Sequence, residues 1–276
     1  MLEIIKMTET EIPFAVSMTD KEQWGYLPAD FGRLMSFEPE GCFIAKSGDQ
    51  QIGMITSTSY DSYAFIGSLI VRREERGKGI GEALMNKAIA YLTEKGVETI
   101  ELDGVFAAVS LYRKLGFRDK YLSLRFARKA ADEYGELFPC PAAMADEIIS
   151  FDKQVTGLNR ARLLNDYFGD TESSIYAIVE NNVRAYALVR KRAEGVFAFG
   201  PLVAINQGYA ESLCQALLKK YGSRNLVIGV PEPNSGFAGF LLENGFYYKQ
   251  PSLRMYLGRK IVCEQYIYGI FSAEKG

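Results

Sequence analysis

A glycine-rich, basic segment is the part of this sequence whose residue types and spacing best suit chemistry. It runs from Val71 to Gly81 and reads VRREERGKGIG. Its glycines let the backbone approach a ligand closely and adopt positive φ. Successive N–H groups before a helix point toward negative oxygens, and the helix dipole adds to their field. Arg76 and Lys78 add positive charge, so the segment is typical of a phosphate-binding loop.

Three phosphate-binding motifs can be compared with this loop. A P-loop requires G-x-x-x-x-G-K-[ST], and the sequence contains no such string. A Rossmann fingerprint needs a third glycine where Glu82 stands, and it needs its first glycine directly after the strand. Both motifs therefore fit poorly. The third motif, R/Q-x-x-G-x-G/A, is matched by Arg76, Gly79 and Gly81.

The flanking patterns predict the elements that position the loop. Leu84, Ala88 and Leu92 recur every fourth residue, as expected of the buried face of a helix. The predicted elements of this half are strands over 41–45, 51–58 and 64–71, a helix over 82–95, a strand over 98–103 and a short helix over 107–115.

The second half of the chain repeats this order of elements. Its predicted elements are strands over 175–179, 184–189 and 197–204, a helix over 209–221, a strand over 225–230 and a short helix over 237–243. Val71 corresponds to Ala204 and Phe117 to Phe246, at nearly constant offsets of 133 and 129 residues. Such internal similarity predicts two copies of one fold. We expect domains over 1–130 and 141–276.

Composition excludes several classes of function. The 276 residues include no histidine, which rules out Ser-His-Asp and Cys-His catalysis and removes the commonest zinc ligand. The four cysteines are far apart, so we expect no metal site and no disulfide framework. A net charge of −2 favours neither a nucleic-acid nor a membrane partner. Without a signal-peptide pattern or a long apolar run, we expect a cytoplasmic protein.

These motifs together resemble the GNAT (GCN5-related) N-acetyltransferase superfamily. The resemblance rests on the loop, on the strand ending Leu69-Ile70-Val71, on the long helix and on the sequence LYRKLGF over 111–117. It is strong over about residues 40–120, and the second half resembles the degenerate copy found in tandem acetyltransferases. It implies an α/β (alpha+beta) fold with two GNAT-like domains, each a mixed, mostly antiparallel sheet flanked by helices.

The resemblance also implies a reaction and a co-substrate. It implies an N-acetyltransferase in which a primary amine, most simply a small molecule, directly attacks acetyl-CoA without a metal. The identity of the amine and the oligomeric state stay open. The residues implied in acetyl-CoA binding are Leu69, Ile70, Val71, Arg76, Gly77, Lys78, Gly79, Ile80 and Gly81. Backbone N–H groups on the strand would polarise the thioester carbonyl.

Tyr112 stands at the position of the family's general acid, where a phenol can protonate the departing thiolate. The alternative is a core tyrosine on an amphipathic helix. The strand before the loop carries no carboxylate, so the family's usual glutamate base is missing. Asp103, at the end of a neighbouring strand, is our candidate base, and its alternative role is to cap the following helix. The family's asparagine contact to pantetheine is replaced by Val105.

The acceptor side is expected near the N-terminal helices, as in the family. Trp24, Tyr26 and Asp30 could form an aromatic wall with an anionic anchor for an amine, although Trp24 also suits simple core packing.

The second domain has lost the chemistry of the first. Its counterpart of the loop, Ala204–Ala210, is shorter, has one glycine and carries no basic residue, and Leu241 replaces Tyr112. We therefore expect it to bind no acyl-CoA and either to complete the acceptor pocket or to stabilise the first domain. Two alternatives for the whole chain are a non-catalytic CoA-binding regulatory module and a transferase of a longer acyl group.

Overall fold

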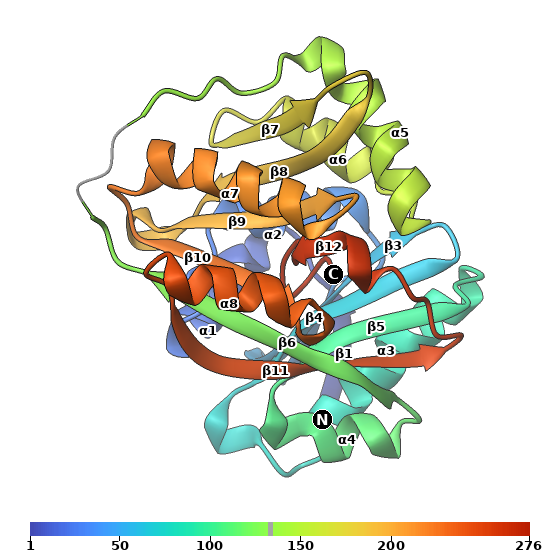
Figure 1. The fold of residues 1–276 in the computed structure, drawn as a ribbon. Helices are drawn as coiled ribbons and strands as arrows, with labels where there is room; N and C mark the ends of the chain where they lie inside the picture. The colour runs from blue at the N-terminus through green and yellow to red at the C-terminus, as the bar shows by residue number, and fades with distance from the viewer. Residues whose placement is uncertain (132–134) are drawn as a thin grey trace. The chain divides into compact units, whose positions relative to one another are not determined.

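The computed structural model describes residues 1–131 and 135–276, which form two compact units (Figure 1). Unit 1 comprises Met1–Asp119, Met255–Lys260 and Ala273–Gly276, and unit 2 comprises Lys120–Arg254 and Ile261–Ser272. The sequence predicted two contiguous domains, 1–130 and 141–276. The structure differs because two short segments from the second half of the chain lie in unit 1, and local sequence patterns do not encode such long-range placement.

Unit 1 is a mixed sheet covered by helices on both faces. Its elements are β1 (Leu2–Lys6), α1 (Ile12–Lys21), α2 (Pro28–Phe37), β2 (Phe43–Ser47), β3 (Gln50–Tyr60), β4 (Tyr63–Val71), α3 (Ile80–Glu94), β5 (Thr99–Gly104) and α4 (Val109–Lys114). Strands β1 to β4 pair antiparallel in chain order, whereas β5 pairs parallel to β4. The segment Met255–Lys260, which includes the end of β11 (Tyr247–Gly258), also belongs to this unit.

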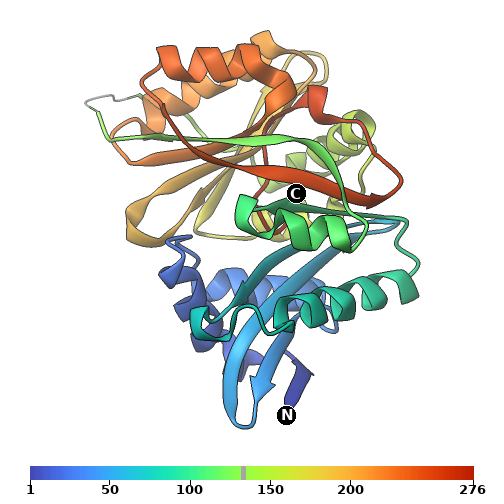
Figure 2. The same ribbon diagram turned by 90° about the horizontal axis from the view of Figure 1, so that it is seen from below.

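The two faces of this sheet carry different helices (Figure 2). Met54 and Ile70 pack with Phe14, Leu34 and other apolar residues of α1 and α2. On the opposite face, a side chain on Gly53 would lie 3.2 Å from Leu84 of α3. The alternation of side chains along each strand thus separates an α1–α2 face from an α3 face.

Unit 2 repeats this architecture. Its elements are β6 (Arg118–Arg128), α5 (Ala145–Thr156), α6 (Ala161–Phe168), β7 (Ser173–Val179), β8 (Val183–Lys191), β9 (Phe197–Ala204), α7 (Gln207–Tyr221), β10 (Leu226–Pro231), α8 (Ser235–Glu243), most of β11, and β12 (Ile267–Gly269). Strands β7, β8 and β9 pair antiparallel, and β10 pairs parallel to β9, as β5 does to β4. The predicted repeat and the predicted mixed, mostly antiparallel sheets are therefore confirmed.

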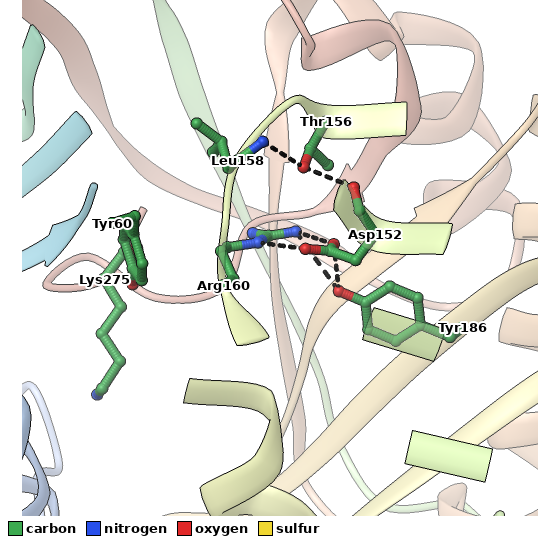
Figure 3. A network of polar contacts seen from close by, with 7 residues as sticks. All are labelled: Tyr60, Asp152, Thr156, Leu158, Arg160, Tyr186 and Lys275. Carbon is green, nitrogen blue, oxygen red and sulfur yellow. Dashed lines mark hydrogen bonds and ion pairs between the residues drawn. The ribbon is translucent and has the colours of Figure 1, made fainter. Parts of the chain in front are cut away.

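The interior of unit 2 contains a buried ionic network (Figure 3). The Asp152 carboxylate accepts hydrogen bonds from Arg160 Nε, at 3.0 Å, and from Tyr186 Oη, at 2.6 Å. All three residues are almost completely buried. Burial, followed by the negative charge of Asp152, raises the pKa of Tyr186 well above its usual value. The network therefore joins α5, the start of α6 and β8 through groups that have little access to water.

Asp152→Leu should lower the free energy of unfolding by about 3–5 kcal/mol, because it leaves the Arg160 guanidinium buried without its counter-charge. Adding Arg160→Met should recover most of this loss, since no buried charge is then left over. Urea unfolding of the intact chain, followed by circular dichroism, measures both effects. The control is Glu172→Ala, which breaks the exposed pair with Lys191 and should cost less than about 1 kcal/mol. Equal losses for Asp152→Leu and the control would contradict this account.

Candidate active site

Strand β4 contains a bulge immediately before the glycine-rich loop. Thr56 pairs with Gly67 and Met54 with Ile70, so two residues of β4, Ser68 and Leu69, lie opposite one residue of β3. Ser68 has a φ of +51°, in the left-handed region that non-glycine residues rarely adopt. Its hydroxyl is buried and has no hydrogen-bond partner among the described residues. Such bulges redirect the backbone and interrupt regular pairing.

The bulge lies at the point where β4 and β5 cease to pair. The last parallel pair is Ile66 with Leu102. Beyond it, Leu69, Ile70 and Val71 have no partner residue in β5, so this edge of β4, apart from the Val71 carbonyl that accepts from Arg76 Nε, is open to an extended ligand. The sequence analysis assigned these three residues to acetyl-CoA binding and their strand to the thioester carbonyl.

The loop itself is shaped by two glycines in the left-handed region. Gly77 has a φ of +80° and Gly79 a φ of +81°. Gly79 is the N-cap of α3, which starts at Ile80 rather than at the predicted Glu82, because Gly79 turns the chain into the helix. Within the described residues, no acceptor is bonded to the backbone N–H groups of residues 77–81. These donors and the helix dipole form an anion-binding site.

The basic side chains of the loop fold back against it. Arg76 Nε donates to the Val71 carbonyl at 3.0 Å, and its guanidinium pairs with Glu22 at 2.7 Å. Lys78 Nζ lies 2.9 Å from Glu75 and is largely exposed. A cavity of about 330 Å³ lies beside these residues, and both the end of β4 and the loop line it. Its lining residues are Met18, Lys21, Glu22, Ile70, Val71, Arg72, Arg73, Glu74 and Arg76.

Tyr112 lies over the end of β5. A side chain on Gly104 would stand 2.7 Å from the Tyr112 ring, so the glycine leaves the space that the ring occupies. The ring also meets Phe117 edge-on, with centroids 6.2 Å apart. Tyr112 is 6 % exposed, and burial raises its pKa to about 12. The phenol therefore keeps its proton at neutral pH. Val105, at the position of the missing asparagine, is exposed.

Asp103 lies at the second-last position of β5 and is half-buried. The last residue of β5 that pairs with β4 is Leu102, so Asp103 is the first residue of β5 beyond the paired region. Gly67 holds the same position on β4. Asp103 therefore lies at the opening between the strands, near the end of β5.

The three residues predicted on the acceptor side all lie around the start of α2. Tyr26 stacks on Phe31, and its hydroxyl donates to the carboxylate of Glu274. Trp24 lies next to it, with ring centroids 6.3 Å apart. Asp30 Oδ2 accepts from the backbone N–H of Leu27 at 2.9 Å, an interaction that caps α2. Trp24 and Tyr26 thus lie side by side, as expected of an aromatic wall. The Asp30 carboxylate instead accepts a hydrogen bond within the first turn of α2.

Glu274 is the residue of this site that sequence reasoning missed. It is 1 % exposed and contacts the acceptor-side tyrosine. Its segment, Ala273–Gly276, has no motif, and nothing in its local pattern indicates which strand it will contact. The unusual Gly67-Ser68 pair within an apolar strand was the one available signal, since glycine in a strand often marks a close backbone approach.

The corresponding region of unit 2 keeps a bulge, since Gly200 and Pro201 of β9 lie opposite Leu188 of β8, but β12 pairs with β9 beyond it and the start of the helix differs. Helix α7 begins directly after Asn206, whose side chain accepts from the Tyr209 backbone N–H at 3.1 Å. One of the free donors at the helix start is therefore already satisfied. Leu241, which corresponds to Tyr112, is completely buried in the core.

Comparison with known proteins places these features in one family. The acetyltransferase (GNAT) family matches residues 6–117, and an acetyltransferase (GNAT) domain matches residues 148–269. The chain belongs to the GNAT family. It is a tandem member, because both halves match. The R-x-x-G-x-G loop, the β4 bulge and Tyr112 all lie in the half matched by the first profile.

Relatives of this GNAT protein extend over its whole length. It is 28 % identical to holothin acyltransferase of Pseudoalteromonas, over 92 % of this chain and 88 % of the relative. A solved structure from Pyrococcus horikoshii, assigned as an acetyltransferase, has a TM-score of 0.82 at 26 % identity and covers 100 % of this chain and 96 % of its own. A tandem GNAT protein from the clavulanic acid pathway shares the fold, with a TM-score of 0.62 at 13 % identity over 94 % and 98 % of the two chains.

The described residues were also compared with the requirements of a membrane-spanning helix and of a metal site. No helix among them is long and apolar enough to cross a membrane. They also contain no group of three or more histidine, cysteine, aspartate or glutamate side chains arranged to hold a metal ion.

Proposed function

We propose that this GNAT protein transfers an acetyl group from acetyl-CoA to a primary amine at the site in unit 1. The single observation that carries the proposal is the pairing of two open backbone regions in one site, namely the edge of β4 after the bulge and the N–H groups of residues 77–81 at the start of α3. The open edge of β4 suits an amide-containing arm such as pantetheine. The N–H groups of residues 77–81 suit a pyrophosphate. These two features are in the order in which the two parts occur in acetyl-CoA.

The residues of this site have distinct roles in the proposed reaction. Backbone N–H groups at Leu69–Val71 would polarise the thioester carbonyl and stabilise the negative charge that develops on its oxygen. Tyr112 would give its proton to the departing thiolate, and its raised pKa keeps that proton available. Asp103, at the opening between β4 and β5, is the base expected from the sequence. The buried carboxylate of Glu274, which accepts from Tyr26, is a second candidate.

The acceptor is proposed to be a small-molecule amine. The supporting observation is that the relative named holothin acyltransferase matches most of this chain, including both units. The buried tyrosines and carboxylates on the α1–α2 face also suit a compact cation better than an extended acidic partner.

Release of CoA thiol tests the proposed function. The intact chain should release thiol from acetyl-CoA at a rate that saturates with acetyl-CoA and depends on an added primary amine. Mass spectrometry of the amine product should show the addition of one acetyl group. Binding of acetyl-CoA without any amine-dependent thiol release would instead support the non-catalytic CoA-binding module. Preference for a longer acyl-CoA in the same assay would revise the acyl group and keep the transferase.

A further inference from the structure

The segment Ala273–Gly276 lies against β4 on the face covered by α1 and α2. A side chain on Gly67 would overlap the Cα and Cβ atoms of Glu274. Thr58 Oγ1 donates to the Glu274 carbonyl at 3.4 Å, and Tyr60 Oη donates to the Lys275 carbonyl at 2.8 Å. Thr58 and Tyr60 share a face of β3 with Met54, which packs on α1 and α2. The segment is therefore anchored by its backbone to the sheet of unit 1.

This anchoring buries an ion pair. Lys275 Nζ lies 2.6 Å from Glu274 Oε1, and both side chains are at most 1 % exposed. The other carboxylate oxygen of Glu274 accepts from the Tyr26 hydroxyl. Removing a charged pair from water costs free energy, which the pairing only partly offsets. Stability alone therefore does not explain why the buried Glu274 carboxylate is paired with the primary ammonium group of Lys275.

The position of Glu274 supplies the reason. It covers Gly67, the first residue of β4 beyond the last pair with β5 and the neighbour of the bulge residue Ser68. The proposed thioester carbonyl would lie along the residues that follow the bulge. A thioester bound there would have its reacting carbon beside Glu274, on the face that carries Tyr26.

The other buried carboxylates of unit 1 have different surroundings. Glu11 Oε2 accepts from the backbone and side chain of Thr8 at the start of a helix. Glu38 lies on the α3 side, bonded to Ser59, Tyr91 and Lys95. Glu101, paired with Phe65, precedes the opening between the strands and accepts from Tyr63 at 3.1 Å. Of these groups, Glu274 is the one held at the bulge.

We propose that Glu274 binds the ammonium group of the acceptor and takes its proton, and that Lys275 occupies this position in the acceptor-free chain. The Lys275 ammonium shows which chemical group the site accepts, namely a primary alkylammonium. The inference rests on the proposed function and assigns its proton acceptor to Glu274 instead of Asp103. Displacing Lys275 weakens the affinity for the acceptor, because the site is open in only a fraction of the molecules.

The proposed step balances in atoms and charge. One proton passes from the acceptor ammonium to Glu274, and the neutral nitrogen attacks the thioester carbon. The C–N bond forms, the C–S bond breaks, and the thiolate takes the proton of Tyr112. Glu274 then gives its proton to water, while Tyr112 regains its proton from the amide nitrogen through water. The products are the N-acetylated amine, CoA thiol and one released proton.

Two small nucleophiles separate proton removal from the other requirements of the reaction. At neutral pH ethylamine is protonated, whereas hydroxylamine is largely neutral and needs no base before attack. Glu274→Gln should lower kcat/KM for ethylamine by about 100-fold or more, the usual scale for loss of a general base, and lower that for hydroxylamine less than about 10-fold. Asp103→Asn serves as the comparison variant. Equal losses for both nucleophiles in Glu274→Gln, or the selective loss in Asp103→Asn instead, would overturn the assignment to Glu274.

Lys275→Met tests the proposal that Lys275 occupies the position of the acceptor. Unlike Glu274→Gln, which should impair the reaction, this substitution should improve acceptor binding. It removes the resident ammonium and keeps a side chain of similar length, so the KM for ethylamine should fall by about 5- to 10-fold. A purely structural ion pair predicts an unchanged or higher KM, and that result would contradict the role of Lys275.

Calorimetry with acetyl-CoA is the control for folding, since both variants should bind it as the unmodified chain does. If Glu274→Gln fails to bind it, the comparison of KM for Lys275→Met still decides. An unmodified chain that transfers acetyl to neither nucleophile would contradict the proposed function itself. That failure is distinct from loss of the selective effect in an active enzyme.

Discussion

Tyr112→Phe should lower kcat by about 100- to 1000-fold, because it removes the proton that the departing thiolate needs. The substitution keeps the aromatic ring against Gly104 and Phe117, so the packing at the end of β5 should persist. Since burial raises the pKa of Tyr112 to about 12, the phenol stays protonated as pH rises toward that value. The kcat profile should therefore show no basic limb from this group at any lower pH. Thiol release with ethylamine measures both quantities.

The matched control is Tyr176→Phe, which removes a hydroxyl from a buried tyrosine of unit 2. Tyr176 bonds to Tyr221 at 2.7 Å and lies outside the candidate site. This control should keep kcat within about two-fold, and any loss of stability from one neutral hydrogen bond should be about 1 kcal/mol. Tyr112→Phe with the same small effect on kcat would show that Tyr112 is a core residue and not the acid.

The second large effect concerns the loop. Gly79→Glu should weaken acetyl-CoA binding by about 100-fold or more, because it places a negative charge at the start of α3, where the pyrophosphate would bind. Such a loss corresponds to about 3 kcal/mol of binding free energy. An added side chain would meet no atom within 4 Å at this position, so the expected effect comes from charge and backbone conformation rather than from a clash. Calorimetric titration with acetyl-CoA measures the change in affinity.

Gly96→Glu controls for backbone strain. Gly96 has a φ of +84°, close to the +81° of Gly79, and an added side chain there also meets nothing within 4 Å. Gly96 follows the other end of α3, far along the helix from the loop. Both variants should lose similar thermal stability, whereas Gly79→Glu alone should lose acetyl-CoA affinity. Equal affinity losses would attribute the effect to strain in the helix and would contradict an anion site at its start.

The features predicted well from the sequence depend on short-range patterns. The R-x-x-G-x-G string, the apolar period of the following helix and the Leu111–Phe117 segment each span only a few residues, so their types report directly on local structure. The repeat was visible because the strand and helix patterns recur at a nearly constant offset. Even the error in the start of α3 has a local cause, since Gly79 caps the helix through a positive φ that an amphipathic pattern does not register.

The features missed depend on contacts between distant segments. The bulge at Ser68 appears only once the register of β4 against β3 is known. The placement of Ala273–Gly276 on β4 joins residues more than 200 positions apart, as in the bond from Thr58 to Glu274. Periodicity and motif spacing cannot predict such pairs, because each segment alone is compatible with many partners. The two contiguous domains expected from the sequence therefore omit a carboxylate of the candidate site.

The central claim is that unit 1 alone binds acetyl-CoA productively, through the open backbone donors at the start of α3. Calorimetric titration of the intact, unmodified chain with acetyl-CoA tests it most directly, because it measures both affinity and stoichiometry. The account predicts saturable binding with one site per chain, since in unit 2 the Asn206 side chain caps α7 and Leu241 replaces the acid. Absence of binding, or two equivalent sites per chain, would contradict it.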